Sequence, residues 1–218
     1  MSSDEATFLF ADIAGFTALT EAHGDEEAVQ LVEEFARVVQ AELPRVDGEH
    51  VKTLGDALMV RVPDPADAIL LGLWITRAAM SGHRAPSVRV GGNHGSAVER
   101  NGDYFGATIN IAARVSALAA GGEMLVTGQT AARAPDLEGV LYESRGRHVL
   151  RNVAEPVEIF AVVPVDESAG HLVVDPVCRM AVDPEHAVGR LLVDENAYYF
   201  CSLTCAAAFA QRPERYAD

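Results

Sequence analysis

Three short segments of the sequence carry polar side chains of the types that can hold a nucleoside triphosphate on metal ions. They supply three carboxylates, a lysine, an amide and a guanidinium, at Asp12, Lys52, Asp56, Asp103, Asn110 and Arg114. Carboxylates are the hard oxygen ligands that Mg²⁺ and Mn²⁺ prefer, and these ions commonly combine one or two carboxylates with substrate phosphates. The basic and amide side chains could bind the rest of such a substrate, so the set indicates phosphoryl chemistry.

Asp12 and Asp56 are the candidate metal ligands, with Ile13 as a further metal-binding position beside Asp12. Asp12 follows the apolar run of residues 7–11, and Asp56 lies in Gly55-Asp56, which is typical of a hairpin tip. Two carboxylates on adjacent strand tips can hold a metal pair that clamps the attacking and leaving sides of a phosphoryl displacement. Taken singly, each aspartate would also suit an ordinary turn.

Lys52 and Asp103 are the candidate readers of a base. Adenine offers an acceptor at N1 and a donor at N6, which match a lysine donor and an aspartate acceptor, whereas guanine reverses this pattern. A site whose polar groups would be left mispaired rejects the wrong substrate strongly. Taken singly, Lys52 would suit a solvated strand and Asp103 a turn.

Asn110 and Arg114 lie four residues apart in a segment predicted to be helical, residues 107–119, so they share one helix face. An ordinary amphipathic helix would also carry such an exposed pair. Asp103 apart, the six candidate residues lie within three motifs whose combination is more specific than any one short motif. They read Asp-Ile-x-Gly-Phe-Thr from Asp12, Lys-Thr-x-Gly-Asp from Lys52 and Asn-x-Ala-x-Arg from Asn110.

With these motifs in this order, the chain resembles the class III adenylyl/guanylyl cyclase catalytic domain over about residues 6–163. The resemblance implies conversion of ATP to 3′,5′-cyclic AMP and pyrophosphate, with two Mg²⁺ or Mn²⁺ ions per active site. It also implies that Asn110 orients the ribose and that Arg114 stabilises charge building at the α-phosphate, which is a large catalytic term. The sequence departs from the usual pattern at Asn93 and at residues 150–153, away from the six site residues.

The same resemblance implies a homodimer with two equivalent active sites at an isologous interface. Each site would combine Asp12 and Asp56 of one protomer with four residues of the other. Those four are Lys52, Asp103, Asn110 and Arg114. The spacing of the residues does not itself require this arrangement.

Hydrophobic patterning predicts an α+β fold, a ferredoxin-like antiparallel sheet with helices, which is also the fold that the resemblance implies. Asp12 is expected to lead from its strand into a loop, and Asp64-Pro65 to open a helix that Gly82 closes. Strands are predicted over residues 7–11, 50–53, 57–62, 87–98 (broken by its glycines), 123–127, 140–149 and 157–163. Helices are predicted over residues 25–43, 65–82 and 107–119.

Composition limits the classes of partner. The chain has 218 residues and a formal net charge of −15, which argues against binding to nucleic acid or to an anionic membrane surface. The longest apolar run, residues 68–75, is too short to span a membrane, and the N-terminus lacks the features of a signal peptide. We therefore expect a cytoplasmic protein.

A second pattern follows the predicted cyclase domain (residues 1–163) and a polar linker (residues 164–170). Residues 171–218, here called the tail, hold all three cysteines of the chain: Cys178, Cys201 and Cys205. The segments Asp175-Pro-Val-Cys178-Arg-Met and Tyr198-Tyr-Phe-Cys-Ser-Leu-Thr-Cys205 resemble the YHS domain, a small cysteine module related to treble-clef metal binders.

The tail is expected to bind a soft metal, because a segment this small buries little apolar surface and a bound metal would stabilise its fold. Three thiolates suit Cu(I), or Zn²⁺ with a fourth ligand, and His186 or His171 could supply that ligand. Spacing does not choose between the two histidines. Alternatively, Cys201 and Cys205 could be small buried hydrophobic residues, as free cysteines often are.

Two hypotheses from different classes follow. The first is an adenylyl cyclase whose activity the tail regulates in response to metal or redox state. The second is a catalytically silent platform for nucleotide binding or dimerisation that carries a heavy-metal-binding module. A guanylyl cyclase is a narrower alternative that Lys52 and Asp103 disfavour, because their hydrogen-bonding pattern matches adenine.

Overall fold

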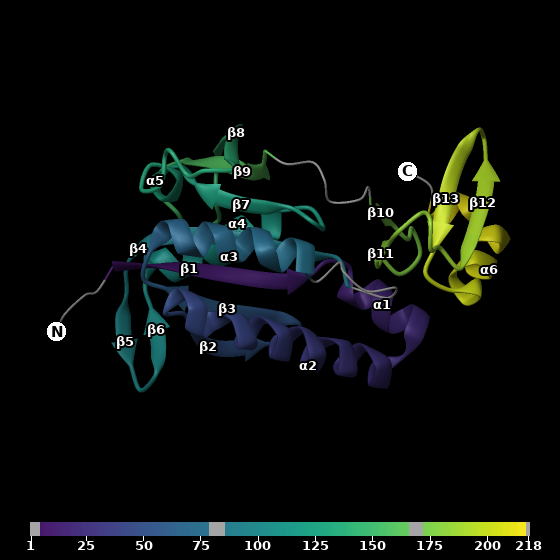
Figure 1. Ribbon diagram of the computed structural model, residues 1–218, viewed down its shortest axis with the longest axis horizontal. Coiled ribbons are helices and arrows are strands. Elements are labelled where there is room, and N and C mark those ends of the chain that lie inside the picture. The colour runs from purple at the N-terminus through teal and green to yellow at the C-terminus, as the bar shows by residue number, and fades with distance from the viewer. Residues whose placement is uncertain (1–4, 79–85, 166–171, 217–218) are drawn as a thin grey trace.

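The computed structural model describes residues 5–78, 86–165 and 172–216. Its main body is a seven-stranded sheet with helices on both faces, and the tail lies beside one end of this body (Figure 1). The strands of the sheet are β1 (Glu5–Ile13), β2 (Glu49–Leu54), β3 (Ala57–Val62), β4 (Val88–Ser96), β7 (Met124–Thr127), β8 (Val140–His148) and β9 (Val157–Pro164). Their order is β2-β3-β1-β4-β7-β9-β8, and only β4 and β7 pair in parallel among these neighbours.

Helices connect most of these strands. They are α1 (Phe16–His23), α2 (Asp25–Glu42), the 3-10 helix η1 (Leu43–Val46), α3 (Pro65–Ala78), α4 (Ala107–Leu118) and α5 (Gly128–Ala131). A two-stranded hairpin, β5 (Val98–Arg100) and β6 (Asp103–Phe105), projects between β4 and α4 (Figure 1). The expected α+β class is confirmed, with β1 to β4 and their helices in βαββαβ order.

Strand β1 lies at the centre of the sheet and is buried on both faces, which explains its nearly unbroken apolar sequence. Alternate side chains enter different cores because successive residues of a strand point to opposite faces. Leu9 and Ala11 pack in the core that α2 and α3 cover, whereas Phe8 and Phe10 pack against the residues of α4. This central position holds the end of β1, and therefore Asp12, in a rigid setting.

Several expected elements are confirmed within one or two residues, including α2, α4, and the β2–β3 hairpin around Gly55-Asp56. The Asp64 cap is also confirmed, since its Oδ1 accepts hydrogen bonds from the backbone N–H groups of Ala66 (2.8 Å) and Asp67 (3.1 Å). The expected end of that helix at Gly82 and residues 166–170 of the linker lie outside the described residues.

Two expectations about local structure are wrong. The residues after Asp12 do not form a simple loop, because residues 16–23 form α1, for which Gly15 takes a left-handed conformation at the N-terminus (φ 75°). Strand β4 is not broken by its glycines but continues to Ser96. At Gly91 an added Cβ would lie 1.9 Å from the backbone nitrogen of Ser116, so glycine here lets α4 approach the sheet closely.

The described part of the tail has its own elements. They are β10 (Val173–Val174), β11 (Ala181–Val182), β12 (Gly189–Val193), β13 (Asn196–Phe200), α6 (Leu203–Gln211) and the 3-10 helix η2 (Pro213–Arg215). Its core residues, including Met180, Phe200 and Phe209, belong to one apolar cluster with Leu19 of α1 and Ala28 of α2. The tail therefore packs directly against the main body at α1 and α2.

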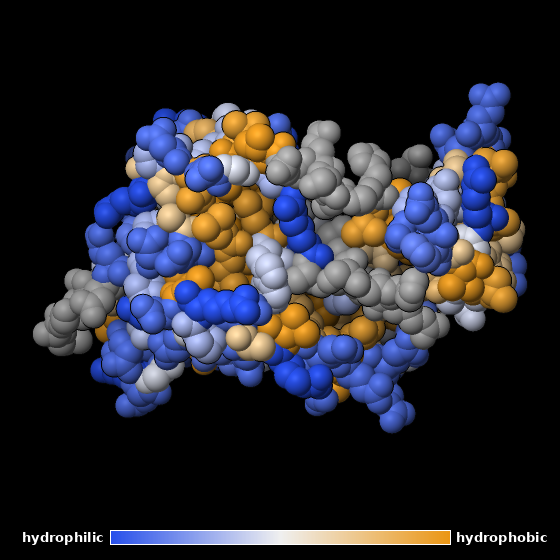
Figure 2. All heavy atoms as spheres, in the orientation of Figure 1, coloured by the Kyte–Doolittle hydropathy of each residue, from blue (hydrophilic) through white to orange (hydrophobic). Residues whose placement is uncertain are grey.

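Hydrophilic side chains cover much of the visible rim of the molecule, whereas apolar side chains gather over α3 (Figure 2). Of these, Leu70 is 45% exposed. Among the helices of the described residues, none combines the length and apolar character needed to cross a membrane.

Candidate functional site

The two candidate metal ligands lie side by side. Asp12 is near the end of β1 and pairs with Ala57 of β3, so Asp56, in the turn before β3, is its close neighbour. Burial raises the pKa of Asp56 to about 6, and the Asp12 carboxylate adds to this through its charge and a hydrogen bond. A neighbouring carboxylate whose charge raises the pKa of Asp56 in this way indicates a place that favours a bound cation. The Ile13 side chain is a buried hydrocarbon with no donor atom, so only the backbone oxygen of this residue could be a ligand.

Arg89 completes this part of the site, and sequence reasoning missed it. It lies opposite Asp12 in the pairing of β4 with β1, and its Nε donates a hydrogen bond to Asp12 Oδ2 at 2.8 Å. No motif points to Arg89, because the contact joins residues that are 77 positions apart in the sequence. In this structure the guanidinium supplies positive charge beside the carboxylates.

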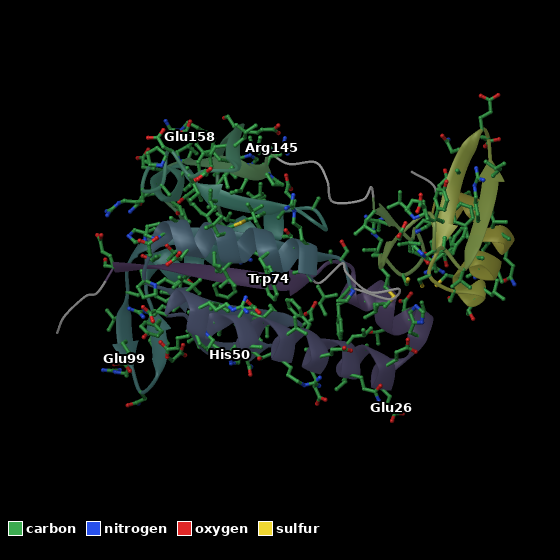
Figure 3. All side chains as sticks on the ribbon, in the orientation of Figure 1. Glu26, His50, Trp74, Glu99, Arg145 and Glu158 are labelled. Atoms are coloured by element: carbon green, nitrogen blue, oxygen red, sulfur yellow. The ribbon has the colours of Figure 1, made fainter. Side chains whose placement is uncertain are left out.

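The two candidate base readers meet directly. Lys52 Nζ, on β2, lies 2.7 Å from both carboxylate oxygens of Asp103, on β6. The hydrogen bond from Lys52 lowers the pKa of Asp103. Each side chain is about one third exposed (33% and 31%), and the ring of Phe105 lies 5.7 Å from Lys52 Nζ. The pair is therefore held in place and still open to a ligand. Figure 3 shows the hairpin that carries Asp103, marked by Glu99.

The third pair, Asn110 and Arg114, lies on α4. Arg114 Nη1 donates a hydrogen bond to the backbone oxygen of Asn110 at 2.9 Å, and the Asn110 side chain is exposed. Ile109, Ala112 and Val115 bury the opposite side of α4 against the sheet. This amphipathic packing aims the amide and the guanidinium away from the core, as their spacing predicts.

The six residues thus form three pairs rather than one cluster. Between residues of different pairs, no hydrogen bond or ion pair is present in the described part of the chain. One chain therefore presents a carboxylate pair, a lysine–aspartate pair and an amide–guanidinium pair, each with contacts of its own.

The three cysteines of the tail come together, as the sequence predicted. All three are free and buried, with Cys178 Sγ 3.4 Å from Cys201 Sγ, and Cys201 Sγ 3.9 Å from Cys205 Sγ. Hydrogen bonds from the other two thiols lower the pKa of Cys205. These contacts between sulfur atoms argue against the alternative that Cys201 and Cys205 are only small buried hydrophobic residues.

Neither expected histidine belongs to this cluster as described. His186 is exposed and its Nδ1 lies 2.7 Å from Asp183 Oδ2, while His171 lies outside the described residues. The histidine that joins the thiols is His23, at the end of α1 in the main body. Sequence reasoning missed it because the contact depends on how the tail packs.

Residues 1–163 match the family model described as the adenylate and guanylate cyclase catalytic domain, and the chain belongs to this family.

Curated relatives carry matching names. The pH-sensitive adenylate cyclase MT1302 of Mycobacterium tuberculosis (strain CDC 1551 / Oshkosh) is 33% identical over 161 residues, which cover 72% of this chain and 40% of that protein. The adenylate cyclase of Streptomyces griseus is 35% identical over 119 residues, covering 55% of this chain and 30% of that protein. The chain thus spans less than half the length of these relatives.

Solved structures share the fold. The adenylate/guanylate cyclase/hydrolase from Silicibacter pomeroyi superposes with a TM-score of 0.66 at 25% identity, covering 75% of this chain and 98% of that one. The adenylyl cyclase CyaB from P. aeruginosa superposes with a TM-score of 0.66 at 22% identity, covering 78% and 98%. At 22% identity, the similarity to CyaB shows a shared fold and nothing about activity.

Proposed function

We propose that this protein is an adenylyl cyclase that converts ATP to 3′,5′-cyclic AMP and pyrophosphate. The observation that carries the proposal is the direct pairing of Lys52 with Asp103, in a chain that also holds the carboxylate pair and belongs to the cyclase family. The curated relatives named adenylate cyclase support the same activity.

The base readers explain a preference for ATP. Lys52 can donate to N1 of adenine, and Asp103 can accept from its N6 amino group. Their mutual ion pair holds both side chains in position before the substrate binds. Guanine would place a donor against the lysine and an acceptor against the aspartate, which leaves both groups mispaired.

The remaining residues act on the ribose and phosphates. Asp12 and Asp56, with the backbone oxygen of Ile13, suit two Mg²⁺ or Mn²⁺ ions by the chemistry of their oxygen donors. When bound, such ions supply positive charge for the triphosphate and lower the pKa of the ribose 3′-hydroxyl. In the proposed reaction, that oxygen attacks the α-phosphorus in line, and the bond to pyrophosphate breaks. Asn110 orients the ribose, and Arg114 stabilises the charge that develops on the α-phosphate.

We further propose a homodimer whose active sites lie at the interface. The three pairs are separate in one chain, and Phe105 next to Lys52 is half exposed (51%), as expected of a surface that a second copy covers. Mixing an Asp12→Ala variant with a Lys52→Ala variant, each inactive alone, should restore about one quarter of wild-type activity. Half of the dimers would then be mixed, each with one intact site. No recovery after subunit exchange would contradict the shared site.

The test of the activity is cyclic nucleotide production by the purified chain from ATP and from GTP, with Mg²⁺ or Mn²⁺. Cyclic AMP formed from ATP and lost in an Asp12→Ala control supports the enzyme and its carboxylate site together. Preferential production of cyclic GMP would contradict the role given to Lys52 and Asp103.

The second candidate function is the silent platform, and the ion pair of Arg89 with Asp12 favours it, because Arg89 competes with metal ions for the carboxylate. Tight ATP binding without product under any metal would support this function. An Arg89→Ala variant distinguishes the two, since gain of product only in the variant would show that the arginine blocks the site.

For the tail, we propose a YHS-type metal-binding module that regulates the cyclase, in a protein located in the cytoplasm. The buried cluster of free thiols supports the metal-binding role. The test compares rates for the full chain and for a chain ending at residue 165, each with and without Zn²⁺ or Cu(I). Identical rates in all four cases would contradict regulation by the tail.

A further inference from the structure

We propose that His23, in the cyclase domain, is the fourth ligand of a tetrahedral zinc site whose other ligands are Cys178, Cys201 and Cys205 of the tail. The metal would therefore connect the cyclase domain to the tail, rather than cross-link residues of the tail alone. Zinc is favoured because a Cys₃His set is a common structural zinc site, and because imidazole and thiolate both suit this ion.

Four of the six distances between ligand atoms lie close to those expected around one zinc ion. A tetrahedron with Zn–S bonds of about 2.3 Å and a Zn–N bond of about 2.0 Å places two sulfurs about 3.8 Å apart and a sulfur and nitrogen about 3.5 Å apart. His23 Nε2 lies 3.7 Å from Cys201 Sγ and 3.9 Å from Cys205 Sγ, and the sulfur–sulfur contacts are 3.4 and 3.9 Å. All four ligand atoms lie within 4.8 Å of one another.

The surroundings of the cluster orient the ligands. With Nε2 facing the sulfurs, His23 Nδ1 lies 3.7 Å from Glu27 Oε1, and a carboxylate on the second ring nitrogen is the usual support of a metal-bound histidine. On the tail side, the buried Asp175 accepts hydrogen bonds from the backbone N–H of Cys201 (2.8 Å), Val177 (2.9 Å) and Cys178 (3.4 Å). Asp175 thus holds the two backbone segments that carry Cys178 and Cys201.

The cluster is sheltered, and a cavity borders it. The His23 side chain is 6% exposed and the three cysteines are buried, which excludes bulk water from the ligands. Cys205 also lines a cavity of about 380 Å³ between α1 and the tail, together with Ala18 and Ala22 of α1. Open space therefore lies next to one of the four ligand residues. In Figure 3, sulfur atoms of the tail lie next to α1.

Because His23 is the last residue of α1, a metal bound to it would restrain this helix of the cyclase domain. Helix α1 has only 8 residues, about 12 Å, and it separates His23 from the turn that follows Asp12. The tail contacts this turn as well, because an added Cβ at Gly15 would lie 2.5 Å from Arg179 Cγ. Zinc would therefore hold both ends of α1 against the tail. Any effect of this on catalysis rests on the proposed cyclase function, whereas the metal site does not.

The test measures metal binding by the full-length chain, kept reduced and stripped with a chelator. Zinc should bind with an affinity that His23→Gln lowers by roughly 100-fold or more, since even changes behind a ligand cost 10- to 100-fold. Cobalt(II) as a spectroscopic probe should give thiolate charge-transfer bands and the visible spectrum of a tetrahedral site. His186→Gln is the matched control and should bind as the wild type does.

Two results would overturn the proposal. One is wild-type zinc affinity and an unchanged cobalt spectrum in His23→Gln, and the other is loss of zinc only in His186→Gln. A melting curve of each metal-free variant shows whether it still folds. As a second measurement, zinc should slow amide hydrogen exchange in residues 16–23 of the wild type but not of His23→Gln, and equal exchange with and without zinc would contradict the bridge. Both readouts are independent of cyclase activity.

Discussion

At the level of single residues, the candidate active site consists of charges that the fold brings close together before a substrate binds. The carboxylates of Asp12 and Asp56 lie close together in a partly buried position. The guanidinium of Arg89 offsets part of their negative charge. Lys52 and Asp103 neutralise each other in a neighbouring part of the chain. The shifted pKa values of Asp56 and Asp103 can therefore be measured without substrate.

The raised pKa of Asp56 predicts how pH changes the stability of the metal-free protein. The pKa is about 6 in the folded state against an ordinary value of 3.8, so the folded state binds more protons between these values. The free energy of unfolding should therefore fall as pH rises through this window, and level off above about 6. Urea titrations with a chelator present would measure this.

The control for that experiment is Asp56→Asn, which removes the titrating group but keeps its size. Its stability should exceed that of the wild type increasingly as pH rises from about 4 to about 6. A constant difference between the two proteins across this range would contradict the raised pKa.

The ion pair of Lys52 and Asp103 predicts the basis of nucleotide choice. In Asp103→Asn the side chain can donate as well as accept hydrogen bonds, so it no longer disfavours guanine. The ratio of kcat/KM for ATP to that for GTP should fall by roughly 10-fold, about the effect of one hydrogen bond. Steady-state rates with both nucleotides would measure it. An unchanged ratio would show that other residues read the base.

At the level of secondary structure, the spacing between α4 and the sheet decides where Asn110 and Arg114 lie. Glycine at position 91 brings the backbone of α4 against β4. Apolar side chains on both sides of this contact bury the inner face of α4. The face of α4 that carries Asn110 and Arg114 is therefore positioned by a close backbone contact rather than by its own polar residues.

Gly91→Ala should displace α4 and destabilise the protein by about 3 kcal/mol, because the new Cβ would lie 1.9 Å from the Ser116 nitrogen and overpacking is costly. Urea unfolding would measure this loss, and cyclase rates should fall with it. Gly139→Ala is the control. No heavy atom of the described residues lies within 4 Å of its added Cβ, and only its positive φ of 76° adds strain, about 1–2 kcal/mol. Equal losses in the two variants would contradict the close contact.

At the level of the whole molecule, the tail covers a face of the main body. Leu19 and Ala28 are each 1% exposed because Phe200, Phe209 and their neighbours pack over them. An isolated helix as short as α1 is marginal in water, so tertiary packing must stabilise it. The tail is therefore part of what holds the segment after Asp12.

A chain ending at residue 165 should exchange the amide protons of α1 faster than the full chain, because its apolar face loses its cover. Hydrogen exchange followed by mass spectrometry would measure this. The amides of β7 are an internal control, since β7 is an interior strand of the sheet and none of its residues belongs to the apolar cluster that joins the tail to α1 and α2. Equal protection of α1 in both chains would contradict a stabilising role for the tail.

The sequence by itself determined the features that depend on local pattern. Apolar periodicity predicted α2, α4 and most strands, and three short segments of the sequence carried the six candidate site residues. The cysteine spacing likewise indicated a thiol cluster in the tail. Such signals are readable because each depends on residues within one helix, one hairpin or one turn.

Tertiary structure alone decided the contacts between distant segments. Arg89 reaches Asp12 only because β4 pairs with β1, and Lys52 meets Asp103 only because the β5–β6 hairpin lies beside β2. His23 joins the cysteines of the tail across more than 150 positions, whereas the sequence offered His186 and His171 as candidate ligands. Packing of preformed elements sets these contacts, and the free energy of that packing comes from buried apolar surface that carries no local motif.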